Sequence, residues 1–164
     1  MLRVSAAEKR HRAAVAAWMK KAGDGLPPAR LVELAERACD ALWSRARLSL
    51  GDVALAAIVD RVLSSASEKF PLLSPLTAGA TAVRFGELRK RAGDVEPRAL
   101  AEGIEYLVFE FLTVVGHLTA EILTPGLHAR LSAVTLEQGE RRTKPRKVTP
   151  KRRTSGPAGT SRTR

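Results

Sequence analysis

A histidine and a glutamate one helical turn apart are the first residues in this sequence that could do chemistry. His117 and Glu121 fall on the polar side of Pro97–Leu123, a run that is helically periodic throughout. Such a pair could supply half of a metal site, or act as an acid and a base. His11 and His128 have no carboxylate at a matching helical spacing, so no second cluster is expected to join the pair. We therefore predict no metal, no cofactor and no catalytic residue, and the protein is not expected to be an enzyme.

The polar side of the same run is instead a candidate interaction face. Its members recur at helical spacing and are expected to be solvated or to contact a partner. They are Glu110, Thr113, His117 and Glu121.

The strongest functional signal is a change of composition after Gln138. Residues 139–164 contain ten Lys or Arg and one Glu, so they carry +9 of the chain's net charge of +11, and residues 1–138 are nearly neutral. The segment has too few apolar residues to form a core, which predicts disorder. Its basic clusters are separated by Pro, Thr and Gly. They comprise Arg141, Arg142, Lys144, Arg146, Lys147, Lys151, Arg152 and Arg153.

In composition this segment is similar to linker-histone tails and other Lys/Arg/Pro arms that coat nucleic acid. Lys and Arg neutralise phosphates without needing a fold, and no aromatic side chain is interleaved for stacking on bases. The first hypothesis is therefore a non-enzymatic module whose basic arm binds nucleic acid without sequence specificity. The alternative is a helical interaction or regulatory domain whose basic tail contacts an acidic partner or surface.

Apolar residues at helical spacing predict the elements that must position these groups. A capping box, Ser5 with Glu8, opens a first, Ala-rich helix that is expected to dock loosely. Thr124 is expected to cap the last helix, with Pro125 at its first position. The predicted helices cover about Ser5–Gly23, Pro28–Leu48, Asp52–Lys69, Val83–Ala92, Pro97–Leu123 and Pro125–Gln138.

The predicted fold is all-α, an antiparallel bundle of four to six helices with one long central helix. Residues 1–138 form the helical domain and residues 139–164 the disordered tail. No strand alternation is visible, and Thr77–Thr81 is expected to be a loop. The sequence leaves the oligomeric state open, a homo-oligomer included.

The run Ala120–Gly126 resembles the H-box of sensor histidine kinases, whose usual pattern is His-Glu-(Leu/Ile)-Arg-Thr-Pro-Leu. Glu121, Ile122, Thr124 and Pro125 match it. Ala120 occupies the phospho-acceptor position, and an alanine has no nitrogen to phosphorylate. The resemblance therefore implies at most a relative of a kinase dimerisation bundle, and we interpret Thr-Pro as a helix junction.

Cysteine content and hydropathy indicate the compartment. Cys39 is the only cysteine, which excludes an intramolecular disulfide and a cysteine-based zinc site, and it is expected to be buried. No apolar run is long enough to cross a membrane, and the basic N-terminus lacks the apolar stretch of a secretory signal. A cytoplasmic protein is expected.

Overall fold

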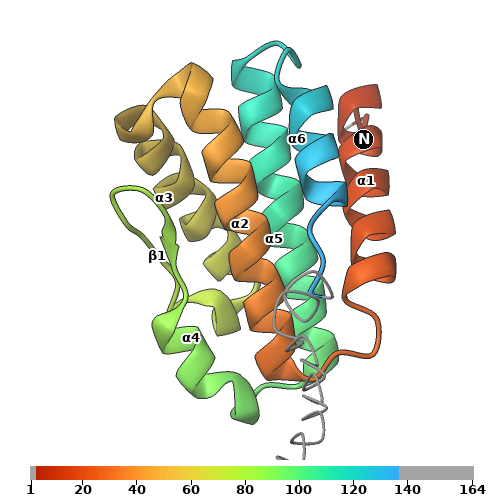
Figure 1. Ribbon diagram of the computed structural model, residues 1–164, viewed down its shortest axis with the longest axis vertical. Coiled ribbons are helices and arrows are strands. Elements are labelled where there is room, and N and C mark those ends of the chain that lie inside the picture. Colours follow the sequence, from red (N-terminus) through yellow and green to blue (C-terminus); the bar gives the residue numbers. More distant parts are fainter. Residues whose placement is uncertain (1–2, 137–164) are drawn as a thin grey trace, which may run out of the picture.

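The computed structural model describes residues 3–136, and these form the predicted all-α bundle (Figure 1). The predicted tail, 139–164, and the boundary that precedes it lie outside the described residues. The helices within residues 3–136 are α1 (Ala6–Ala22), α2 (Pro28–Leu50), α3 (Asp52–Lys69), α4 (Gly86–Arg91), α5 (Pro97–Leu118) and α6 (Thr124–Ser132). No helix of this part of the chain is long and apolar enough to span a membrane.

Helix α5, with 22 residues against 23 in α2, lies inside the bundle and contacts α1, α2, α3 and α6 (Figure 1). The elements alternate in direction, so α1, α3 and α6 begin at the end of the bundle where α2 and α5 finish. We call this the upper end, as drawn in Figure 1, and the opposite end the lower end.

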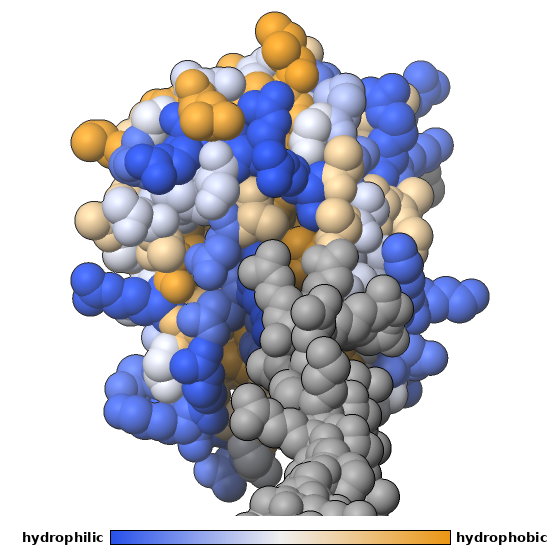
Figure 2. Space-filling view, viewed as in Figure 1, coloured by the Kyte–Doolittle hydropathy of each residue, from blue (hydrophilic) through white to orange (hydrophobic). Residues whose placement is uncertain are grey.

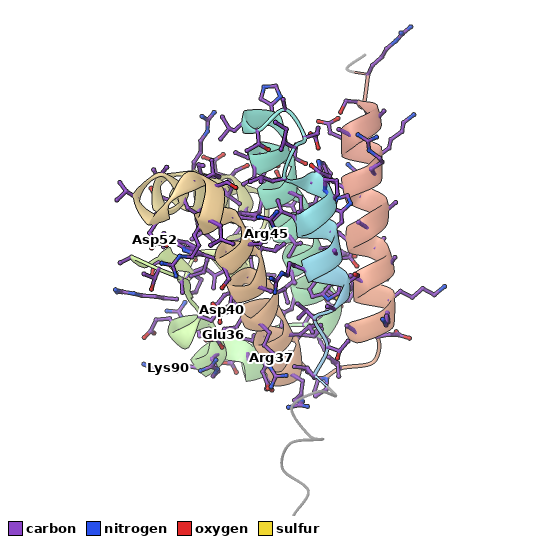
Figure 3. All side chains as sticks on the ribbon, turned by 45° about the horizontal axis from the view of Figure 1, so that its top comes forward. Glu36, Arg37, Asp40, Arg45, Asp52 and Lys90 are labelled. Carbon is purple, nitrogen blue, oxygen red and sulfur yellow. The ribbon has the colours of Figure 1, made fainter. Side chains whose placement is uncertain are left out.

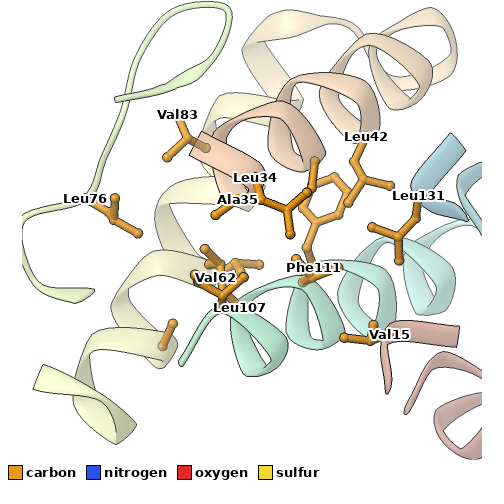
Figure 4. Close-up of a cluster of buried hydrophobic side chains, with 14 of the residues drawn as sticks. Val15, Leu34, Ala35, Leu42, Val62, Leu76, Val83, Leu107, Phe111 and Leu131 are labelled. Atoms are coloured by element: carbon orange, nitrogen blue, oxygen red, sulfur yellow. The ribbon is translucent and has the colours of Figure 1, made fainter. Parts of the chain in front are cut away.

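The apolar stripe of α5 forms the centre of the core, as its periodicity predicts. Phe111 is only 7% exposed, and it packs with side chains from α2, α3 and α6, several of which are visible in Figure 4. The buried positions of α5 repeat every three or four residues, which is the spacing of one helix face. They are Leu100, Gly103, Ile104, Leu107, Val108, Phe111, Leu112, Val115 and Gly116.

The first helix packs firmly, and the expectation that it docks loosely is wrong. The predicted capping box is present, because Ser5 Oγ accepts from the Glu8 backbone N–H and Glu8 accepts from that of Ser5. One side of α1 is buried against α5 and α6. Alanines elsewhere on the helix dilute the apolar signal, and one buried position is a histidine, which hides the stripe in the sequence. The buried residues are His11, Val15, Trp18 and Met19.

A single glycine joins α2 to α3. Gly51 has φ 75° and ψ 160°, a conformation that is essentially restricted to glycine. Asp52, visible in Figure 3, fixes the corner by accepting hydrogen bonds from Trp43 Nε1 at 3.0 Å and from Arg47 at 2.9 Å. The corner therefore holds α2 and α3 side by side with no loop between them.

Residues 71–95 contain more structure than predicted. Two-residue strands, β1 (Thr77–Ala78) and β2 (Val83–Arg84), pair antiparallel, and 3-10 turns lie at Pro71–Leu73 and Ala92–Asp94. Strands this short cannot show an alternating pattern, which explains why a loop was expected. The short helix starts three residues later than predicted, at Gly86.

The long helix ends earlier than predicted, at Leu118 rather than Leu123. Ala120 and Glu121 have positive φ angles of 49° and 63°, and the Glu121 backbone N–H donates to the Gly116 carbonyl at 2.7 Å. This six-to-one hydrogen bond closes the helix as in a Schellman motif. Such a stop usually has a glycine in the left-handed position, and the absence of one explains the error.

The last helix is also shorter than predicted, ending at Ser132 rather than Gln138. Leu123 occupies the cap position and Thr124 lies in the first turn, so the expected side-chain cap is absent. The predicted apolar positions of this segment are nevertheless buried, including two beyond the helix. They are Leu127, Leu131, Val134 and Leu136.

We expect Phe111→Ala to lower the free energy of unfolding by about 3–5 kcal/mol, because it removes a buried ring from the core. Phe109→Ala is the matched control, since Phe109 is only partly buried on the outer side of the same helix and should cost clearly less. Urea unfolding at one temperature measures both. Equal losses, or no loss for Phe111→Ala, would remove α5 from the centre of the core.

Candidate binding groove and histidine cluster

A groove of about 720 Å³ runs between α3 and α5. Three of the four predicted interaction-face residues, Glu110, Thr113 and His117, lie on its α5 side. The other wall is the outward side of α3, which contributes Ser64 and Ser65 among others. The structure thus places these three residues along one groove and adds a second helix to its lining.

The groove changes character along its length because α3 and α5 are antiparallel. Toward the upper end it is lined by Ala57, Ile58 and Leu118, with Leu118 60% exposed. Toward the lower end two carboxylates, Glu68 and Glu110, line it. Arg61 and His117 also line the groove, so ionisable side chains accompany the apolar ones.

The polar groups of the groove are loosely paired. Ser65 Oγ lies 3.4 Å from the Tyr106 hydroxyl and 3.5 Å from Glu110 Oε1, both at the long limit of hydrogen bonding. The buried hydroxyl of Thr113 has no hydrogen-bond partner within residues 3–136. The Ser65 hydroxyl is thus weakly bonded, and the Thr113 hydroxyl is buried without a partner.

Glu121 does not belong to this groove. Because α5 stops at Leu118, the chain turns Glu121 away from His117, and its carboxylate lies 3.2 Å from Nε2 of His11 on α1. His11 Nδ1 lies 2.9 Å from Nε2 of His128 on α6, and the two rings meet edge to face with centroids 5.1 Å apart. The predicted His117–Glu121 pair is therefore wrong, and Glu121 belongs to a His11–His128–Glu121 cluster.

Burial governs the electrostatics of this cluster. His11 is 1% exposed, and desolvation lowers its pKa below the ordinary 6.5, against the opposing charge of Glu121. Desolvation also lowers the pKa of His128, assisted by the neighbouring His11. Both imidazoles are therefore neutral at pH 7. The ring-to-ring contact is satisfied when His128 Nε2–H donates to His11 Nδ1, which puts the His11 proton on Nε2, 3.2 Å from Glu121 but without hydrogen-bond geometry.

The turn after α5 is shaped around the Glu121 carboxylate. A side chain at Gly116 would place its Cβ within 2.7 Å of a Glu121 oxygen, so the glycine leaves room for that group. The Thr124 hydroxyl, in the first turn of α6, also donates to Glu121. Three separate segments of the chain thus meet at one carboxylate.

The pairing of His11 with His128 and Glu121 is not visible in the sequence, because the three residues lie on different elements. The one available signal is that His11 stands four residues before Val15 and seven before Trp18, on the buried stripe of α1. A histidine on an apolar stripe must find a polar partner elsewhere in the fold. Periodicity alone does not say where.

The basic site residues, Arg141 to Arg153, lie outside the described residues, but the end of the described chain is well fixed. The Trp18 indole N–H donates to the Val134 carbonyl at 3.0 Å in a buried bond, and Arg37 on α2 donates to the Thr135 carbonyl at 3.3 Å. Figure 3 shows Arg37 on the lower half of α2. The segment that precedes the basic residues is thus held by α1 and α2 in the lower half of the body.

Exposed large apolar side chains gather at the other end. All five such residues within 3–136 belong to the segments where helices begin or finish at the upper end, and Figure 2 shows hydrophobic side chains concentrated there. Two of them adjoin the groove: Leu118 lines it, and Val53 precedes Ala57 by one turn of α3. The five residues are Val4, Leu48, Val53, Leu118 and Ile122.

Cys39 faces the core and is not a reactive thiol. It is largely buried beside Trp43 and Leu63, and burial raises its pKa to about 12. A thiol that stays protonated is a poor nucleophile and a poor metal ligand.

No family model matches the chain, and no curated protein or solved structure is similar to it.

We expect protein purified without a histidine tag to contain no stoichiometric metal. Within residues 3–136 no group of three or more His, Cys, Asp or Glu side chains is arranged to hold a metal ion. In the histidine cluster two ring nitrogens face each other at hydrogen-bond distance, which leaves no space for an ion between them. Metal analysis of the purified protein tests this. One equivalent of zinc or iron that is lost on changing His117 or His128 to Ala would contradict it.

Proposed function

We propose that the protein is a non-enzymatic helical module that binds nucleic acid, without sequence specificity, through its basic segment 139–164. The observation that carries this proposal is the distribution of charge. The segment holds +9 of the net +11, whereas residues 1–138 are nearly neutral. Long-range attraction to phosphate must therefore come from the segment and not from the helices.

The body supports this proposal by fixing where the segment starts. Val134 and Leu136 are buried and Val134 is hydrogen-bonded to Trp18, so the attachment point has a definite position on α1 and α2. The α3–α5 groove is lined by residues of α3 and α5, and none of these lining residues belongs to α1 or α2. A nucleic acid held by the segment would therefore leave the groove accessible to a second partner.

Binding of this kind is governed by release of counterions. If about six of the ten cations neutralise phosphates, the logarithm of affinity should fall against the logarithm of salt concentration with a slope of about −5 on duplex DNA. Affinity should depend little on sequence, because contacts to phosphate carry no direct sequence information.

We expect removal of residues 139–164 to abolish duplex binding and to leave the melting temperature almost unchanged, because the segment has too few apolar residues to add to a core. Fluorescence anisotropy at salt concentrations of roughly 50–300 mM measures the affinity and its slope. A matched variant replaces Arg141, Arg142 and Lys144 by Gln and should make the slope less negative, by at most about 3. Equal binding by the full and shortened chains, or none by the full chain at low salt, would reject the proposal.

The second candidate function is a protein interaction through the α3–α5 groove. The specific observation that favours it is that the groove combines exposed apolar surface, Leu118 above all, with the weakly bonded hydroxyl of Ser65. Buried apolar contact with a few polar contacts is the usual composition of an interface. The basic segment would then contact an acidic part of the same partner or surface.

Photocrosslinking tests this candidate with a pair of identical residues. A photoreactive phenylalanine at Ser64, exposed in the groove, should give a discrete protein adduct, whereas one at Ser44, exposed on α2 outside the groove, should not. The chain is shortened to residues 1–138 so that nucleic acid cannot bridge the partners. Thr113→Arg should suppress the Ser64 adduct by filling the groove. The same adducts from both positions, or none, would contradict a groove interface.

A further inference from the structure

The histidine cluster is the one place where α1, the turn after α5, and α6 are joined by polar side chains. His11 comes from α1, Glu121 from the turn, and His128 from α6. The segment after α6 leads within a few residues to Val134, whose carbonyl accepts the Trp18 indole N–H. The packing of α6 on α1 therefore also determines how the chain that precedes the basic segment is held.

The turn that presents Glu121 is held against its own backbone preference. Ala120 and Glu121 are consecutive residues without a glycine's freedom, yet both have positive φ. Such conformations persist only where the surrounding structure fixes them. Here the fixing contacts are those of the Glu121 carboxylate with His11 and with Thr124. A loss of those contacts would release the turn.

The hydrogen bond between the two rings depends on their protonation. One nitrogen of the pair must keep a lone pair to accept from the other. One added proton gives the pair a single positive charge, which the Glu121 carboxylate can balance. On His11 this charge would be buried. A second proton removes the accepting lone pair and sets two cations 2.9 Å apart against a single carboxylate.

The other charged groups near the cluster do not offset this. Arg10 lowers the pKa of both histidines, and Glu8 raises that of His11 only as a minor contribution. From α2, which packs on α6, the Arg45 side chain lies over Gly126, two residues before His128. The groups facing the pair are thus one close carboxylate, a more distant one, and two arginines.

We propose that the His11–His128–Glu121 cluster is a proton-operated latch. While both imidazoles are neutral, the latch keeps α6 and the segment at Val134 that follows it docked on α1. Protonation of both rings removes the ring-to-ring hydrogen bond, sets two cations against each other across the contact of α1 with α6, and undocks α6. The proposal is independent of what residues 139–164 bind.

The direction of the pH dependence follows from the lowered pKa values. In the unfolded or undocked chain the histidines titrate near 6.5, and in the docked state they titrate lower. The undocked state therefore binds more protons in the interval between these values. The docked state keeps its full stability above pH 6.5 and loses it as the pH falls from there through the folded pKa values.

Trp18 reports directly on the latch, because its indole bonds to Val134 beyond α6. In full-length Trp43→Phe protein, Trp18 is the only tryptophan. Its emission should shift to longer wavelength as the pH falls from about 8 to about 5, with the transition below pH 6.5. Far-UV circular dichroism on the same samples should change less and at lower pH, which separates undocking from global unfolding.

The three histidines of the chain provide the matched variants. His128→Gln keeps an N–H donor toward His11 but cannot take up a proton, and it should reduce or abolish the shift. His117→Gln, in the α3–α5 groove, should leave the shift unchanged. Glu121→Gln removes the charge that favours protonated imidazoles, and should move the transition to lower pH.

An emission that stays constant over this range, or a transition that His117→Gln alters and His128→Gln does not, would overturn the proposal. If a cluster variant does not fold, the unsubstituted protein still decides the matter by NMR of its imidazole rings. The latch requires that His11 and His128 titrate below 6.5 together with the Trp18 shift. Titration of either at 6.5 or above, or separately from that shift, rejects it.

Discussion

The structure depends on covering the apolar stripe of one helix. The 22 residues of α5 form a rod about 33 Å long, and its buried positions run from Leu100 to Gly116. A stripe of that length must be covered by several helices, and α1, α2, α3 and α6 all contact it. Two helices packed side by side leave a groove along the solvent side of their contact. The α3–α5 groove is of this kind. It exists because α3 has to cover the apolar stripe of α5.

The point at which α5 ends determines where Glu121 lies, and so whether the histidine cluster can form. If the helix continued to Leu123, Glu121 would lie one turn beyond His117 on the outer face, beside the groove. The stop at Leu118 instead directs Glu121 inward, where Gly116 leaves room for it and His11 supplies a partner. The earlier helix end therefore places Glu121 against the buried ring of His11 instead of on the outer face of α5, although its side chain stays 30% exposed.

Much of this fold could be predicted from the sequence because the information is local. The capping box at Ser5, the proline at the start of α5 and the apolar repeat through Phe111 each act within a few residues, and the structure confirms them. The loose docking of α1 was a wrong prediction because Trp18 and Val134, which bond to each other, are distant in sequence. The end of α5 was misplaced for a related reason. Glu121 has a positive φ, which a glutamate disfavours, and its contact with His11 on α1 helps to stabilise that conformation.

The two candidate sites also differ in how local the information is that could predict them. Glu110, Thr113 and His117 could be assigned to one face because a helix places residues at three- and four-residue spacing together, but the opposing wall from α3 could not be inferred. The histidine cluster left no periodic signal. Its members lie on different elements, and what unites them is the cost of burying polar atoms without partners. In a bundle with few aromatic residues, such a cluster does more than fill space, because it restricts which helix faces can meet.

Charge and packing therefore act at different places in this molecule and over different ranges. Attraction of phosphate to residues 139–164 would extend over the Debye length, roughly 8–10 Å at physiological salt, and needs no fixed geometry. Contacts in the α3–α5 groove, by contrast, require matched surfaces. The segment through Val134 and Leu136 links the two, because it is bound by α1 and α2 at one end of the body and continues from α6. The histidine cluster lies at the contact between α6 and α1. Any event that loosens this contact would move the place at which residues 139–164 are attached to the body, without changing their charge.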